Sequence, residues 1–266
     1  MTLDVYTAVG VVDILKGGST LPPIMEVVDE NGKPQKLHVV KVFKPSNIEQ
    51  YQPTNKEFYA YALADEFDLL RPKAALIYVD DSIIQDLQKR KIYTNFGLKA
   101  GYYYGCEYLS NSVSYEVSKL GSFETWELAR IFAFDVLIRN MDRRVNKPNI
   151  LLYEQDFHLI DHELSLNIPP DKEGTFYLDP KVSQVFCTGN RRHIFYPHLK
   201  AANKKEGIEF AEFRECLKHL DVSLLSTIAK QLKEQDTEDV VYIMNYLNCI
   251  KRHENQFINL LKQLLV

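Results

Sequence analysis

Asn140-Met-Asp-Arg-Arg-Val-Asn-Lys-Pro-Asn-Ile-Leu-Leu-Tyr153 is the stretch that decides the fold, and it leads through a polar break into Phe157-His-Leu-Ile-Asp161. Two apolar runs separated by a short polar turn predict a β-hairpin. Because hairpin strands are antiparallel, Asn149 at the start of the first strand is expected beside Asp161 at the end of the second. Asp142 lies in the loop that leads to the same end. An amide oxygen and two carboxylates suit Mg²⁺ held on phosphates.

Composition narrows the class of protein. The chain has 266 residues, 45% of them hydrophobic, and a net charge of −4. This length predicts one two-lobed domain or two small ones, with no basic surplus for binding nucleic acid or an anionic membrane. No apolar run reaches the roughly 18 residues that span a bilayer, and an N-terminus with Asp4 and Asp13 is a poor signal peptide. Four widely spaced cysteines without a CxxC pair predict reduced thiols in the cytoplasm.

The first part of the chain, residues 1–110, has an α+β pattern. One helix is expected at 55–67, between Pro53-Thr54 and Arg71-Pro72. The stretch 80–101 could hold a short helix. An Asn-Gly turn signal joins the second expected strand to the third. We therefore expect an antiparallel sheet that carries one helix, with strands at 6–15, 24–28, 37–43, 74–79 and 102–109.

The second part, residues 111–266, is mainly helical around the hairpin. Apolar residues recur at helical spacing over 123–139 and surround the helix between 131 and 138, so this helix is expected to be buried. Residues 169–206 show little periodicity and are expected to be loops. Residues 207–266 predict three or four amphipathic helices without a recognised motif. A cleft between two such lobes is a natural ligand site.

Lys41 lies in the apolar segment Val39-Val-Lys-Val-Phe43. A lysine in a strand that is apolar on both faces is costly unless its ammonium meets an anion, and its replacement by methionine would then keep or raise stability. The alternative is an edge strand with one lysine in solvent. Glu57 opens the following helix, where the helix dipole favours a carboxylate. It could instead pair with Lys41 and aim the ammonium at phosphates.

The polar residues around the hairpin also have structural alternatives. Asp142 could cap a turn, and Asp161 could simply end a strand. His162, Lys147 and His193 are expected to be structural. The segment 16–20, which contains Gly18, Ser19 and Thr20, could cover phosphates with its backbone amides or could form an ordinary turn.

Together these residues resemble the HipA-like protein kinases, especially the short stand-alone HipA-like domain proteins, with protein kinases and phosphatidylinositol kinases as wider relatives. The resemblance covers roughly residues 5–200, in order. It is carried by Gly-Gly-Ser-Thr-Leu-Pro22, Val-Val-Lys41-Val-Phe, Asn55-Lys-Glu57-Phe, Phe134-Asp-Val-Leu-Ile-Arg-Asn-Met-Asp142-Arg, Asn146-Lys-Pro-Asn149-Ile-Leu-Leu and Leu159-Ile-Asp161-His-Glu.

The resemblance implies a two-lobed kinase-like fold and a role for each matching residue. Lys41 would hold the α- and β-phosphates of ATP, with Glu57 as its orienting partner. Asp142 would be the catalytic base, and Asn149 and Asp161 would hold Mg²⁺. Residues 102–109 would form the hinge that contacts adenine. These roles fit phosphoryl transfer, which needs positioning and charge neutralisation more than covalent chemistry.

The chain departs from the family pattern at three places. Many relatives read Asp-Arg-His where this chain has Asp142-Arg-Arg144. The step from Asp142 to Asn149 is two residues longer than usual, so Asn146 is a rival metal ligand. The glycine-rich loop is minimal.

The sequence therefore predicts an ATP- and Mg²⁺-dependent phosphotransferase that acts on a protein Ser/Thr hydroxyl, with a regulatory partner protein also conceivable. The alternatives are a catalytically weak nucleotide-binding or interaction protein on the same fold, and a kinase of small molecules or lipids. No contact with membranes or nucleic acid is expected.

Overall fold

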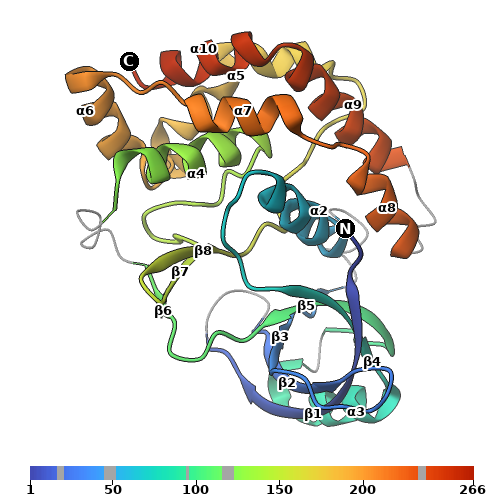
Figure 1. Cartoon of the computed structure of the whole chain (residues 1–266). Helices are drawn as coiled ribbons and strands as arrows, with labels where there is room; N and C mark the ends of the chain where they lie inside the picture. Colours follow the sequence, from blue (N-terminus) through green and yellow to red (C-terminus); the bar gives the residue numbers. More distant parts are fainter. Residues whose placement is uncertain (17–20, 45–51, 94–95, 116–122, 233–237) are drawn as a thin grey trace.

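A computed structural model describes the chain from residue 1 to 266 apart from 17–20, 45–51, 94–95, 116–122 and 233–237. The strands of the first hundred residues gather at one end of the molecule and most helices at the other (Figure 1). Helix α2 and the strands β6–β8 lie between these two regions (Figure 1). The elements expected in the first region are therefore present, in the expected order.

The sheet closes into a five-stranded barrel with the order β1-β2-β3-β5-β4. Its pairs are antiparallel except for β1 and β4, which run parallel with Asp4 opposite Ala75. The expectation of an entirely antiparallel sheet is wrong at this pair. A parallel pair needs a long crossover, and the chain between β1 and β4 provides one that includes helix α2. The barrel strands are β1 (Asp4–Ile14), β2 (Pro23–Val28), β3 (His38–Val40), β4 (Ala74–Val79) and β5 (Gly101–Glu107).

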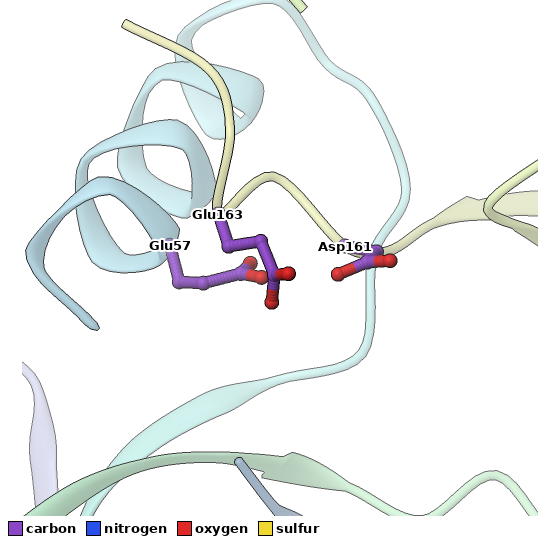
Figure 2. Close-up of side chains that lie close together, drawn as sticks. All are labelled: Glu57, Asp161 and Glu163. Carbon is purple, nitrogen blue, oxygen red and sulfur yellow. The ribbon is translucent and has the colours of Figure 1, made fainter. Parts of the chain in front are cut away.

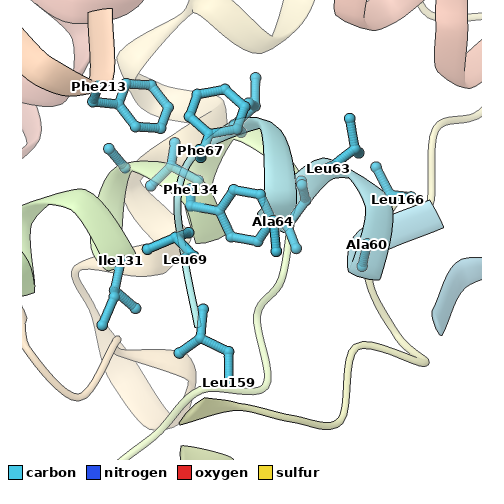
Figure 3. Close-up of a cluster of buried hydrophobic side chains, with 14 of the residues drawn as sticks. Ala60, Leu63, Ala64, Phe67, Leu69, Ile131, Phe134, Leu159, Leu166 and Phe213 are labelled. Carbon is cyan, nitrogen blue, oxygen red and sulfur yellow. The ribbon is translucent and has the colours of Figure 1, made fainter. Parts of the chain in front are cut away.

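Helix α2 (Pro53–Glu66) belongs to the larger of two hydrophobic cores. The barrel interior forms the smaller core together with helix α3 (Asp81–Lys89), the short helix of the stretch 80–101. Just beyond α2, Phe67 stacks on Phe213 at 4.7 Å between ring centroids and also contacts Phe134 (Figure 3). This packing fixes α2, and with it Glu57, against the helical part of the chain.

The hairpin that the sequence predicts is formed by β7 (Ile150–Tyr153) and β8 (Asp156–Leu159). Ile150 pairs with Leu159 in this antiparallel ladder, and β6 (Val113–Ser114) adds a third strand. Glu154 and Gln155 both have positive φ, as a tight two-residue hairpin turn requires. Asn149 and Asp161 at the open end also have positive φ (51° and 64°), a conformation that Asn and Asp tolerate better than most residues.

The expectation of three or four amphipathic helices after residue 207 is confirmed, with four in the part of the chain that the structure describes. The expectation that residues 169–206 are loops is wrong. Residues 169–206 form several short helices as well as α6. Helix α6 buries one residue, Leu199, so its sequence shows no periodic apolar pattern from which the helix could be predicted. None of the helices in the described ranges has the length and apolarity to cross a membrane. The elements are α4 (Thr125–Leu137), η3 (Gly174–Leu178), α5 (Pro180–Ser183), η5 (Gly189–Arg191), α6 (Tyr196–Glu206), α7 (Ala211–His219), α8 (Leu224–Gln231), α9 (Glu238–Arg252) and α10 (Glu254–Leu264).

Candidate active site

Lys41 directly follows β3, and its backbone N–H donates to the carbonyl of Tyr104 at 2.9 Å. Strand β3 pairs with β2 on one side and β5 on the other, so it is not an edge strand. The side chain is 12% exposed, and its ammonium reaches the carboxylate of Glu57. The ion pair expected between Lys41 and Glu57 is therefore present, and the solvated-lysine alternative does not hold.

The ammonium of Lys41 contacts three carboxylates. Besides Glu57 it contacts Asp161 Oδ1 at 2.5 Å and Glu163 Oε2 at 3.3 Å. Oxygens of these three acids lie within 4.8 Å of one another, Glu57 coming from α2 and the other two from the segment after β8 (Figure 2). Glu163 belongs to the motif that follows the second hairpin strand, two residues after Asp161, and the sequence grouped it with the oxygen ligands there without a specific role.

Burial and charge act against each other in this cluster. Burial lowers the pKa of Lys41, but the neighbouring carboxylates outweigh burial and hold that pKa well above its ordinary value. Burial raises the pKa of Asp161, yet Lys41 and Lys147 bring it below its usual range. Burial raises the pKa of Glu163 to about 7, because Lys41 compensates it only in part. The cluster thus holds more acidic groups than its lysine can neutralise.

Asp142 is buried in the loop before the hairpin, 7% exposed. Its Oδ1 accepts from Arg144 Nη2 at 2.7 Å and its Oδ2 from Lys147 Nζ at 2.5 Å. The same Lys147 ammonium lies 3.0 Å from Asp161 Oδ2, so one cation joins the two carboxylates. The turn from Arg144 to Lys147 folds this side chain back into the site, and the structural role expected for Lys147 stays a prediction.

The structure distinguishes the two rival asparagines. Asn149 is buried, and its amide nitrogen lies 3.5 Å from Asp142 Oδ2. Its backbone carbonyl accepts from the N–H of Ile160, which places it at the same hairpin end as Asp161. Asn146 is exposed in the turn between Arg144 and Lys147. Asp142, Asn149 and Asp161 therefore converge as the hairpin register predicted.

A fully buried arginine holds this loop in place. Arg143 Nε donates to Asp135 Oδ2 of α4 at 2.5 Å, and Nη1 donates to the carbonyl of Asn149 at 2.5 Å. Its Nη2 lies 3.1 Å from Nε2 of His162, whose backbone N–H donates to Glu57 Oε1 at 3.0 Å. Burial and the Arg143 guanidinium lower the pKa of His162 to about 3, so this ring stays neutral. The network connects α4, the loop, the hairpin exit and α2.

His193 and Asp135 complete the buried network that holds the loop around Asp142. His193 Nε2 lies 2.9 Å from Asp135 Oδ2, and its Nδ1 accepts the backbone N–H of Phe195, which confirms the structural role expected for this histidine. Burial raises the pKa of Asp135, but Arg143 and His193 bring it well below its ordinary value. Sequence inspection missed Asp135 and Arg143. The available signal was a single charged residue, Asp135, inside the stretch 131–138 that is otherwise apolar all round.

The sequence predicts a phosphate-binding loop at 16–20. Gly18, Ser19 and Thr20 of this loop lie outside the described residues.

The side chains around Asp161 have the oxygen donors that a Mg²⁺ site needs. Asp161 and Asn149 offer a carboxylate and an amide oxygen at one hairpin end, with Glu163 within reach of Asp161. Hard oxygen donors of this kind fit Mg²⁺, and the ammonium of Lys147 shows that the pocket between the two aspartates accepts positive charge.

The profile of the HipA-like kinases matches residues 31–179, which is more than half of the sequence. The chain belongs to the HipA-like kinase family. The matched range contains Lys41, Glu57, Asp142, Asn149 and Asp161. No curated protein matches the full sequence.

Solved structures show that the fold is shared with kinases. The Helicobacter pylori proinflammatory kinase CtkA superposes with a TM-score of 0.51 at 12% identity, over 93% of this chain and 92% of CtkA. LicA in complex with AMP gives a TM-score of 0.32 at 12% identity, over 95% of this chain and 92% of LicA, a likeness too weak to argue from. Membership of the HipA-like kinases thus agrees with the fold and with the order of the site residues.

Proposed function

We propose that this HipA-like chain is an ATP- and Mg²⁺-dependent phosphotransferase that acts on a Ser/Thr hydroxyl of a protein. The observation that carries the proposal is the convergence of Lys41, Asp142, Asn149 and Asp161 in one polar cluster. They come from the barrel, the loop and the open end of the hairpin. A group of this kind can neutralise phosphates and orient a hydroxyl, which is most of what phosphoryl transfer requires.

In this proposal each side chain has one task. Lys41, oriented by Glu57, binds the α- and β-phosphates of ATP. Asp161 and Asn149 hold Mg²⁺, which supplies charge neutralisation on the phosphates when it is bound. Asp142 orients the acceptor hydroxyl and accepts its proton.

The proposal extends to the arrangement of the chain. Residues 1–110 and 111–266 act as two lobes with the site between them, and residues 102–109, within and after β5, form the adenine hinge. We also expect the protein to work in the cytoplasm, where its four cysteines, all free in the structure, stay reduced.

Two matched variants test this function. Asp142→Asn should keep the stabilisation by ATP and Mg²⁺ seen in thermal denaturation while turnover falls by roughly 10²- to 10⁴-fold. Asp161→Asn should instead make ATP-induced stabilisation independent of Mg²⁺, because a ligand stabilises only as far as it binds the folded state. Unchanged turnover in Asp142→Asn, or unchanged Mg²⁺ dependence in Asp161→Asn, would contradict the assigned roles.

One observation favours a second candidate, a nucleotide-binding protein without catalysis. Both oxygens of Asp142 are engaged by cations, Arg144 on one and Lys147 on the other, so an acceptor hydroxyl would have to displace one of these contacts to reach the carboxylate. The parent protein decides between the candidates. Stabilisation by ATP and Mg²⁺ without turnover of ATP towards any acceptor would establish the binding protein.

A further inference from the structure

A cleft of about 290 Å³ lies against Asp142. Its walls include Lys56 of α2, Met141 and Arg144 of the loop, Leu164, and Arg191 of η5. Lys41, Glu57, Asn149 and Asp161 do not line it. The cleft therefore adjoins the cluster assigned to phosphates only through Asp142, the residue assigned to the acceptor hydroxyl.

The side chains that line this cleft carry more positive than negative charge. Two arginines from separate segments, Arg144 and Arg191, line the cleft with one carboxylate, that of Asp142. The buried Lys56 also lines it, but the two arginines alone outnumber the carboxylate. Among the described lining residues no other acid is present. The cleft thus has an excess of positive charge at the place where an acceptor would approach.

The two arginines still have hydrogen-bonding capacity. Arg144 donates Nη2 to Asp142, but its buried Nε–H meets no acceptor among the residues that the structure describes. Arg191 is exposed, and its Nη1 makes a long contact of 3.9 Å with the sulfur of Met141. A guanidinium matches the planar geometry of a carboxylate or phosphate, so both groups are suited to an anionic partner.

Resting on the proposed function, we infer that this cleft selects acceptor peptides in which acidic side chains flank the Ser or Thr. The hydroxyl oxygen would form the new bond to the γ-phosphorus, its proton would pass to Asp142, and ADP would leave with the electrons of the broken bond. Arg144 and Arg191 would pair with the flanking carboxylates. A peptide with basic flanks would be rejected by charge repulsion.

The shape of the cleft favours a chain segment over a compact small molecule. Arg191 is exposed, and Leu164 is 45% exposed and offers an apolar wall at the rim. The exposed guanidinium of Arg191 thus stands at the edge of the cleft and not inside a closed pocket. An extended peptide can meet such a rim residue by residue.

The test compares two fluorescent peptides that share a central serine and carry either glutamate or lysine flanks. Binding is followed by anisotropy in the presence of Mg²⁺ and a non-hydrolysable ATP analogue, and phosphate transfer from ATP is measured in parallel. The acidic peptide should bind roughly tenfold more tightly than the basic one, the size expected from two or three partly screened charge contacts, and the preference should weaken with salt.

Arg191→Glu is the decisive variant, and Arg192→Glu is its matched control. Arg192 is the next residue, is also exposed, and does not line the cleft. Arg191→Glu should abolish or invert the preference for acidic flanks, whereas Arg192→Glu should retain it. Equal binding of both peptides by the parent, or equal effects of the two variants, would overturn the inference.

Other outcomes separate this inference from the proposed function. Selective binding of the acidic peptide without phosphate transfer would support the cleft assignment and overturn the proposed catalysis. A loss of ATP affinity in Arg191→Glu that is the same with either peptide would assign Arg191 to the nucleotide and overturn the inference. Transfer to inositol phosphates or anionic lipid vesicles, with no binding of either peptide, would overturn it in favour of a small-molecule or lipid acceptor.

Discussion

At the scale of a single residue, the surroundings of Lys41 decide how its buried charge affects stability. The sequence predicts that Lys41→Met keeps or raises stability, since a charge in apolar surroundings would be removed. The structure reverses this expectation, because the ammonium compensates Glu57, Asp161 and Glu163 together. Removing one partner of a buried ion pair leaves uncompensated charge in the interior, which costs more than removing both partners.

We therefore predict that Lys41→Met lowers the free energy of unfolding by about 3–5 kcal/mol and weakens ATP binding. Urea denaturation at neutral pH and thermal denaturation with and without ATP measure the two effects. The control is Lys36→Met, which removes a lysine whose ion pair with Glu107 is largely in solvent, and which should change stability by less than about 1 kcal/mol. A Lys41→Met protein as stable as the parent would show that the three acids do not depend on this lysine.

A second prediction at this scale concerns the two asparagines. Asn149→Ala should raise the Mg²⁺ concentration needed for ATP-induced stabilisation by about tenfold or more, because it removes a buried oxygen donor beside Asp142 and Asp161. Asn146→Ala, in the exposed turn, is the matched control and should behave like the parent. The reverse result would mean that the turn and not the hairpin supplies the amide ligand.

At the scale of elements, the loop that carries Asp142 depends on one buried bridge. Arg143 ties α4 to the start of β7 and to the exit from β8, so three elements share one side chain. The position of Asp142, the residue before it, follows from that anchor. An error of about 1 Å in such a group can reduce catalysis by roughly 10²-fold.

Arg143→Met should therefore lower the free energy of unfolding by about 3–5 kcal/mol, since Asp135 would keep a buried negative charge without its guanidinium partner, beside the ring of His193 and the amide of Asn140. In the double variant Arg143→Met/Asp135→Asn the loss should be smaller than the sum of the two single losses. Equilibrium urea denaturation of the four proteins measures this coupling. Strict additivity would contradict a shared network.

At the scale of the whole molecule, buried histidines make stability depend on pH. Burial lowers the pKa of His193 despite the neighbouring Asp135, and burial also lowers the pKa of His38 in β3. The folded state therefore binds protons at lower pH than the unfolded chain, in which histidine titrates near about 6.5. The stability due to these neutral rings is complete above about pH 6.5 and is lost as pH falls below it.

We predict that each such histidine contributes a decrease in the free energy of unfolding between about pH 7.5 and about pH 5.5, with a slope of up to about 1.4 kcal/mol per pH unit. Glu163, whose pKa burial raises to about 7, contributes in the opposite direction, because the folded state takes up its proton at higher pH than the unfolded chain. Urea denaturation across this range gives the slope. His193→Gln, which keeps a hydrogen-bond donor for Asp135, should reduce the slope, while His219→Gln at the exposed end of α7 should leave it unchanged. A His193→Gln protein with the same slope as the parent would contradict the assignment.

The sequence by itself determined the features that depend on neighbours along the chain. Alternation and turn residues predicted the hairpin at 150–159, and its antiparallel register alone placed Asn149 and Asp161 at one end. Helical spacing predicted the buried helix α4. The strand pattern around Lys41 left two alternatives open, a counter-charge or a solvated edge lysine, and the resemblance to the HipA-like kinases implied Glu57 as the partner. The hairpin and the helix rest on local patterns of apolar residues, which a linear chain displays directly.

Only the tertiary structure decided which distant segments form ion pairs and which strands pair. The parallel pairing of β1 with β4 depends on the crossover between them, and the return of Lys147 to Asp142 and Asp161 depends on a turn that no alternation encodes. The same holds for the anchor formed by Arg143 and Asp135, because a buried ion pair is recognisable only when both partners are placed in space. The cationic cleft beside Asp142 combines side chains from α2, the loop and η5, which lie far apart in the sequence, and proximity of that kind is a property of the packed molecule.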